Sequence, residues 1–221
     1  MKLHPLLKDK KLVLFDFDGT LVDSMGMWID IDRKILEVNG LPVPDGLTER
    51  LIPLNEDETA AVFLELGCQG TVQSIRELHD DLAQEQYEQH IQLKVGAREL
   101  LDTLRANGIR IGIVSASTLT RMLPCINRLG LTGYFNIILP CGEYDVNKHT
   151  PEPYRMALQY LNAEAADTVF VDDFYGNVLG AKQAGLSTVG IYDAAGETTW
   201  DKMQQSADLS VRSLTELLEE E

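Results

Sequence analysis

Hydrophobic and polar positions along this chain follow two alternating patterns. Apolar residues recur every three or four positions in several stretches, as they do on one face of an amphipathic helix. Asn-Gly or Gly ends some of these stretches, at 107–108, 130 and 185, as expected at helix C-termini. Short apolar runs of strand length separate them, and they stand at 12–15, 109–114, 135–139, 168–171, 188–192 and, more weakly, 209–211.

Strands that alternate with helices form right-handed βαβ units and a mainly parallel sheet. The runs are apolar throughout rather than at every second residue, which indicates helices on both faces of the sheet. We therefore predict an α/β fold with a Rossmann-like three-layer core. At the end of the chain, residues 214–221 are predicted to form a solvated amphipathic helix that frays over its last three glutamates.

Between the first strand and residue 95 the pattern is helical only. One helix is indicated by the spacing of Trp28, Ile31 and Ile35, and a second by residues 59–66. A third begins near residue 75 and runs on past 87 and 91. We predict a helical cap at 24–94, inserted after the first strand of a core made of residues 1–23 and 95–221.

Polar side chains follow four of the predicted core strands. They are Asp16 and Asp18, Ser115, Lys148, and the pair Asp172 and Asp173. Taken singly, each has a simple structural explanation: an Asp-Gly turn, a helix cap or a solvated lysine. The carboxyl ends of parallel strands meet at one edge of a sheet, however, so these residues are expected to converge there. A set of four at the correct strand ends favours a reaction site.

The residue types indicate the chemistry of that site. Clustered carboxylates suit Mg²⁺, which takes a few carboxylates together with water and a substrate phosphate. A carboxylate can also attack phosphorus and form an acyl phosphate. The hydroxyl of Ser115 and the ammonium of Lys148 can bind phosphoryl oxygens.

Composition narrows the class of partner. The formal net charge is −16, which argues against nucleic acid and against anionic membrane surfaces. The three cysteines are scattered, as in reduced cytosolic proteins. No signal-peptide pattern and no apolar run of about 18 residues is present. We expect a cytoplasmic protein, monomeric or homodimeric, that acts on a small phosphorylated metabolite.

Four sequence motifs carry a resemblance to a known family. They are DFDGTLVDS at 16–24, IVSAS at 113–117, KHTPEPY at 148–154 and VFVDDFYGNVLGAKQAG at 169–185. The chain resembles a haloacid dehalogenase (HAD) superfamily phosphatase of the β-phosphoglucomutase-like branch, with a small helical cap. It departs from the family pattern at His149, where Pro usually follows the lysine, and at Phe174 and Asn177, where Ser and Gly are usual.

The resemblance implies a role for each candidate residue. Asp16 would be the nucleophile and Asp18 the general acid and base. Mg²⁺ would be held by the Asp16 carboxylate, the Asp18 backbone carbonyl and Asp173, with help from Asp172. Ser115, the backbone N–H of Ala116, and Lys148 would bind the phosphoryl group.

Among the activities of this family, hydrolysis of a small phosphomonoester is favoured. The dehalogenase branch of the family lacks an aspartate at the position of Asp18, because its members expel halide and need not protonate an ester oxygen. A phosphomutase must also bind a second phosphate, and residues 24–94 hold 14 acidic side chains against 5 basic ones. A β-phosphoglucomutase-like mutase is the alternative, and a non-catalytic binding or regulatory protein is a third hypothesis.

Overall fold

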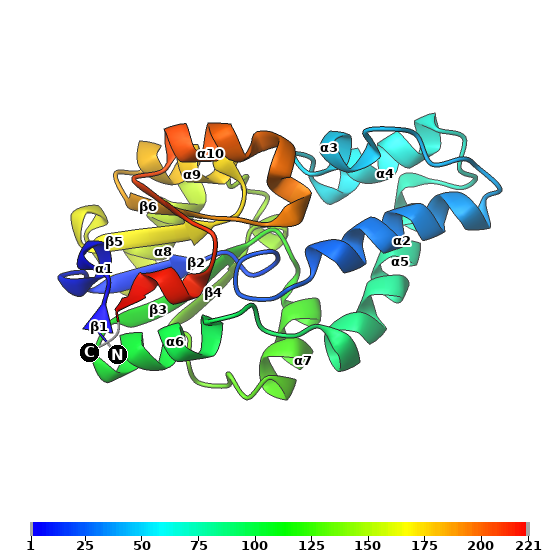
Figure 1. Ribbon diagram of the computed structural model, residues 1–221. Coiled ribbons are helices and arrows are strands. Elements are labelled where there is room, and N and C mark those ends of the chain that lie inside the picture. Colours follow the sequence, from blue (N-terminus) through cyan, green and yellow to red (C-terminus); the bar gives the residue numbers. More distant parts are fainter. Residues whose placement is uncertain (1, 220–221) are drawn as a thin grey trace.

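The computed structural model describes residues 2–219, and its centre is a six-stranded parallel sheet (Figure 1). The strand order is β4-β3-β2-β5-β6-β7, so the first long strand, β2, lies in the middle. The strands are β2 (Leu12–Phe15), β3 (Arg110–Ser115), β4 (Ile137–Pro140), β5 (Thr168–Asp172), β6 (Ser187–Ile191) and β7 (Leu209–Val211). The predicted α/β fold with a mainly parallel sheet is confirmed.

Both faces of the sheet are covered, which explains why its strands are apolar throughout. Val13 and Phe15 of β2 belong to one buried cluster, which includes residues of α6 (Ala97–Ala106) and α7 (Leu119–Arg128). Leu12 and Leu14 belong to a second cluster with residues of other helices. Those helices are α8 (Glu152–Leu161) and α9 (Tyr175–Gln183). Successive side chains of a strand point to opposite faces, so β2 is buried from both sides.

Residues 24–94, called the insert below, form only helices apart from one isolated backbone bridge, between Leu93 and Val22 of the core. They comprise α2 (Met25–Val38), α3 (Leu47–Leu51), α4 (Glu56–Glu65), α5 (Val72–Glu85) and the π-helix η1 (Gln86–His90). A capping box between Asn55 and Glu58 begins α4, because each residue's side chain accepts from the other's backbone N–H. Figure 1 shows α2 to α5 grouped to one side of the sheet, beyond the carboxyl end of β2.

The two connections between insert and core run side by side. The backbone N–H of Asp23 donates to Gln92 O and that of Lys94 donates to Leu21 O, both at 2.9 Å. Entry and exit of the insert are therefore close together beside the end of β2. The division into a core and a separately moving cap stays a prediction.

The chain termini differ from the prediction. Leu214–Leu217 form a 3₁₀ turn (η5) rather than the start of a solvated helix, and Leu214 and Leu217 are fully buried. Leu218–Glu219 (β8) then pairs antiparallel with Lys2–Leu3 (β1). The predicted tail helix is therefore wrong over 214–219, because burial of the two leucines and pairing with the N-terminus replace it. Residues 220 and 221 lie outside the described part of the chain.

Several further elements depart from the sequence pattern. The third helix of the insert changes from α to π geometry at Gln86, and β4 begins two residues later than predicted. The pattern also did not predict α1 (Pro5–Lys8), α3 or α10 (Trp200–Ser206). Over residues 2–219, every helix is too short or too polar to pass through a bilayer.

Candidate active site

The end of β2 brings the first two aspartates to the edge of the sheet. The backbone N–H of Asp16 donates to Val171 O at 2.9 Å, so pairing with β5 extends to that residue. The chain then turns at Gly19, which has φ +75° and whose N–H donates to Val22 O. A Cβ at Gly19 would lie 2.2 Å from Asp173 Oδ2, so the absence of a side chain lets the turn approach β5.

Three carboxylates converge at this edge. Oxygens of Asp16, Asp172 and Asp173 all lie within 4.8 Å of one another. Asp16 and Asp172 are buried, whereas Asp173 is half-buried. The predicted meeting of the β2 and β5 strand ends is thus observed.

Lys148 joins this carboxylate cluster from the loop before α8. Its ammonium lies 2.7 Å from Asp16 Oδ1 and 2.8 Å from Asp172 Oδ2, and its side chain is 6% exposed. A buried ammonium between two carboxylates is a fixed charge rather than a solvated surface group. The structure therefore excludes the interpretation of Lys148 as a solvated lysine.

Electrostatics in the carboxylate cluster favour an added cation. Burial raises the pKa of Asp16 to about 7, Lys148 acts in the opposite direction, and Asp172 adds to the rise. Burial, followed by the charges of Asp172 and Asp16, likewise raises the pKa of Asp173 well above its usual value. Burial alone would lower the pKa of Lys148, but its two carboxylate partners raise it. The cluster holds three carboxylates but one ammonium, which pairs with two of them, and the carboxylate oxygens fit Mg²⁺.

Asp172 is held by groups that follow it in the chain. Its Oδ1 accepts the backbone N–H of Phe174 at 2.7 Å, and the side-chain amide of Asn177 lies 3.1 Å from both of its oxygens. The departures from the family motif at 174 and 177 therefore leave Asp172 with defined donors. Phe174 also packs against His149, whose pKa is lowered by burial and by the charge of Lys148.

Asp18 is held by three hydroxyl groups. Ser24 Oγ donates to its Oδ1 and Ser117 Oγ to its Oδ2, both at 2.6 Å, and Tyr87 Oη donates to Oδ1 at 2.5 Å. Ser24 and Ser117 lie inside two of the motifs, whereas no sequence signal distinguishes Tyr87 from other apolar positions of the insert. These contacts were not predicted.

The remaining candidates lie at the end of β3 and directly after it. Ser115 is its last residue and is 1% exposed, and its Oγ accepts the backbone N–H of Ser117 at 3.1 Å. Ala116 follows and is exposed. Since β3 pairs with β2 in register up to Ile113 and Phe15, Ser115 lies at the same edge of the sheet as the aspartates.

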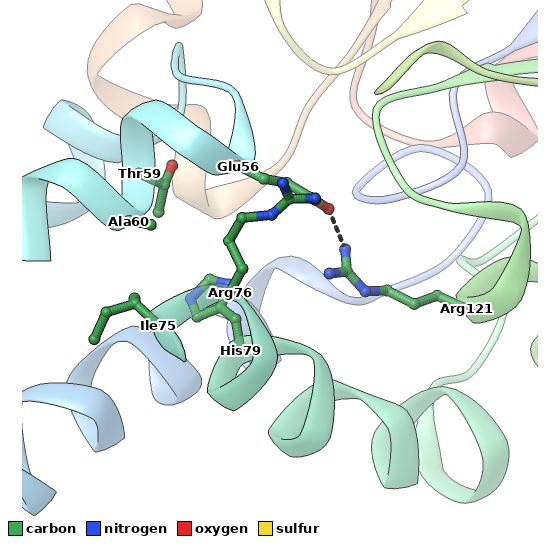
Figure 2. A pocket seen from close by; sticks show the side chains of 7 residues that line it. All are labelled: Glu56, Thr59, Ala60, Ile75, Arg76, His79 and Arg121. Carbon is green, nitrogen blue, oxygen red and sulfur yellow. Dashed lines mark hydrogen bonds and ion pairs between the residues drawn. The ribbon is translucent and has the colours of Figure 1, made fainter. Parts of the chain in front are cut away.

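Two further charged contacts join the insert and its linker to the core. Lys94 forms an ion pair with Asp193, which is 7% exposed and whose charge contributes to the raised pKa of Asp173. Arg121 of α7, 5% exposed, reaches Glu56 of α4 at 2.7 Å and also pairs with Asp80 of α5. Figure 2 shows the Arg121–Glu56 contact beside a cavity of about 10 Å³, which also involves Arg76 and His79. A cavity of that size has room for about one water molecule.

Comparison with known proteins identifies the family to which this chain belongs. The family model of the haloacid dehalogenase-like hydrolases matches residues 13–191. A phosphoglycolate phosphatase of Yersinia pestis is 31% identical over 188 residues, which cover 81% of this chain and 79% of that protein. Pyrophosphatase PpaX of Halalkalibacterium halodurans is 28% identical and covers 94% of both chains.

A solved structure supports the same assignment at the level of the fold. The β-phosphoglucomutase of Clostridium difficile superposes with a TM-score of 0.80 at 22% identity, over 95% of this chain and 93% of that one. The chain therefore belongs to the haloacid dehalogenase-like hydrolases, as a phosphatase. The family resemblance carried by the four motifs is confirmed.

Proposed function

We propose that the chain hydrolyses a small phosphomonoester in a Mg²⁺-dependent reaction through an aspartyl-phosphate on Asp16. The observation that carries this proposal is the buried Asp16 carboxylate, which lies 2.7 Å from the Lys148 ammonium inside a cluster of three carboxylates. Asp16 is shielded from water and positioned by Lys148, which suits its carboxylate to act as a nucleophile.

The metal would be held by the carboxylates of Asp16, Asp172 and Asp173 together with the backbone carbonyl of Asp18. Bound there, Mg²⁺ would neutralise carboxylate and phosphoryl charge, so that two anions could approach each other. Lys148 would supply a second fixed positive charge beside Asp16. Ser115 Oγ and the backbone N–H of Ala116 would donate hydrogen bonds to the phosphoryl oxygens.

Two steps balance the reaction. First, an oxygen of Asp16 forms a bond to phosphorus while the ester P–O bond breaks, and the leaving oxygen takes a proton from the Asp18 carboxyl group. Second, a water molecule gives a proton to the Asp18 carboxylate and attacks phosphorus, and the bond between phosphorus and Asp16 breaks. Inorganic phosphate is released and both aspartates return to their starting state.

The insert favours hydrolysis over phosphomutase activity. Each of its five basic residues is paired with a carboxylate. The pairs are Arg33–Asp30, Lys34–Glu37, Arg50–Glu65, Arg76 with Glu56 and Asp57, and Lys94–Asp193. Within residues 24–94, all of which are described, the insert offers no lysine or arginine without an acidic neighbour as a cation for the second phosphate of a bisphosphate. A mutase needs such a cation.

The proposed substrate class rests on the names of the relatives. The matched relatives are named for phosphoglycolate and pyrophosphate hydrolysis, so we propose a small phosphorylated metabolite as the substrate. A cytoplasmic location and a monomeric or dimeric state remain predictions.

The test is a panel of phosphomonoesters assayed for phosphate release with Mg²⁺ and with EDTA. We expect wild-type activity on one class of ester, loss of that activity in EDTA, and a loss of more than about 10³-fold in Asp16→Asn. Asp9→Asn, which changes an exposed aspartate of the same core, is the control and should retain wild-type activity.

Two results would contradict the proposal. Equal activity of Asp16→Asn and wild type would remove Asp16 as the nucleophile. No hydrolysis of any ester, together with isomerisation of glucose 1-phosphate primed by a bisphosphate, would replace the phosphatase by the mutase.

A further inference from the structure

Tyr87 is a buried side chain at the C-terminal end of the insert that contacts Asp18. It is fully buried and lies in η1, the π-helical turn at the end of the insert. Its hydroxyl donates to Asp18 Oδ1 at 2.5 Å, across 69 positions of sequence. Single π-helical turns are rare and occur frequently at functional sites, because they shift one side chain out of the α-helical order.

The ring of Tyr87 is fixed from two sides. It stacks on Phe17, the residue between the two site aspartates, with 6.5 Å between ring centroids, and it packs edge-on against Trp28 at 6.0 Å. The guanidinium of Arg128 in α7 donates to the backbone carbonyls of Tyr87 and Ile91, which anchors both ends of the turn to the core. The phenol hydroxyl therefore has a defined position relative to Asp18.

The Tyr87 hydroxyl is one of three donors that hold the Asp18 side chain. Two serine hydroxyls complete the arrangement, since Ser24 shares Oδ1 with Tyr87 and Ser117 bonds Oδ2. The Asp18 side chain thus has donors on both oxygens, which restricts rotation of the carboxylate.

We propose that Tyr87 is a positioning residue that sets the orientation of the Asp18 carboxyl group for proton transfer to the ester oxygen. This inference rests on the proposed function, in which Asp18 protonates the leaving group. Tyr87, at the end of the insert, would thus influence the reaction through Asp18, without contacting the phosphoryl group itself.

The dependence on the leaving group tests this role. An alkyl phosphate expels a strongly basic oxygen and needs the acid, whereas p-nitrophenyl phosphate expels a stable phenolate and needs it little. Tyr87→Phe keeps the ring and removes only the donor. For the alkyl phosphate that the panel shows to be hydrolysed fastest, we expect kcat/KM to fall about tenfold or more, and for p-nitrophenyl phosphate less than about threefold.

Tyr134→Phe is the matched control, because the Tyr134 hydroxyl also donates to a carboxylate, that of Asp102 at 2.6 Å, outside the site. It should leave both values of kcat/KM unchanged. A second variant, Arg128→Gln, keeps the Tyr87 phenol but removes the anchor of the π-helical turn. It should show the same selective loss on the alkyl ester, and it carries the test if Tyr87→Phe does not give a folded protein by circular dichroism.

Equal losses on the two esters, or no loss on either, would overturn the proposal. Failure of the underlying reaction is recognised separately. If Asp16→Asn still hydrolysed both esters, the proposed function would be wrong. If Asp16→Asn were inactive and Tyr87→Phe showed no selectivity, only the role of Tyr87 would be wrong.

Discussion

Asp173 shows at the scale of one residue why the site calls for a cation. Its side chain lies among the oxygens of Asp16 and Asp172, and the Lys148 ammonium pairs with those two rather than with Asp173. The Thr20 hydroxyl approaches Asp173 Oδ1 only at 3.4 Å, a long contact for an O–H donor. Repulsion among the three carboxylates is thus only partly compensated by groups of the chain, and a bound Mg²⁺ would complete the compensation.

Metal binding at Asp173 predicts a change in thermal stability that does not depend on turnover. Saturating Mg²⁺ should raise the Tm of the wild-type protein by about 5 °C or more, since a ligand that binds only the folded state stabilises it. Asp173→Asn should lose most of that rise, and Asp9→Asn should keep it. An equal rise in the wild type and in Asp173→Asn, measured by scanning calorimetry, would place the metal elsewhere.

At the scale of elements, the sequence predicts those helices and strands whose apolar residues recur at a regular local spacing. Strands β2 and β5 were predicted because their runs are apolar and end at aspartates, and α4 because apolar residues recur at helical spacing over 59–66. The C-terminal segment was mispredicted because Leu214 and Leu217, three residues apart, fit a 3₁₀ turn as well as an α-helix. Contacts with β1 and α6 decide between the two geometries, and neither is visible in a short sequence window.

Gly96, at the start of α6, depends on one of those contacts. It has φ +83°, and a Cβ there would lie 2.6 Å from the backbone nitrogen of Thr215. Gly96→Ala should therefore cost backbone strain of about 1 kcal/mol or more, plus displacement of the C-terminal turn η5. Gly108→Ala is the matched control, because Gly108 has φ +71° and no atom near the added Cβ.

Urea unfolding would measure both free energies. We expect a clearly larger loss of the free energy of unfolding for Gly96→Ala than for Gly108→Ala. If the two variants lost the same free energy of unfolding, the packing of η5 against Gly96 would be wrong.

At the scale of the whole molecule, the site is completed by residues that the fold brings together from distant parts of the chain. The aspartates and Lys148 follow core strands, so strand ends in the sequence predicted them. The hydroxyls of Tyr87 and Ser117, the amide of Asn177 and the carboxylate of Asp193 were missed. Each acquires its contact only when the insert returns to the core or when a helix packs beside its strand.

Arg121 is the main ionic contact between α7 and the insert helices. It is buried, pairs with Glu56 and Asp80, and lies 5.3 Å from the Trp28 ring centroid. Removing its charge would break the ion pair with Asp80 and leave Arg76 as the remaining ionic partner of Glu56, so the charged contact between α7 and the insert would be lost. In Arg121→Gln we therefore expect the insert to separate from the core more often, with an increased radius of gyration in small-angle X-ray scattering.

Arg50→Gln is the control for this variant, because Arg50 pairs with Glu65 inside the insert and is exposed. It should scatter like the wild-type protein. An unchanged radius of gyration in Arg121→Gln would show that the ion pairs of Arg121 do not hold the insert against the core.

The central claim is that Asp16 carries the phosphoryl group, and chemical trapping tests it most directly. The protein would be mixed with a substrate and Mg²⁺, quenched within milliseconds and reduced with borohydride, which converts an aspartyl-phosphate to homoserine. Peptide mass spectrometry should then find homoserine at position 16 in the wild-type protein and none in Asp16→Asn. Phosphate release without homoserine at position 16, or with homoserine at another aspartate, would contradict the account.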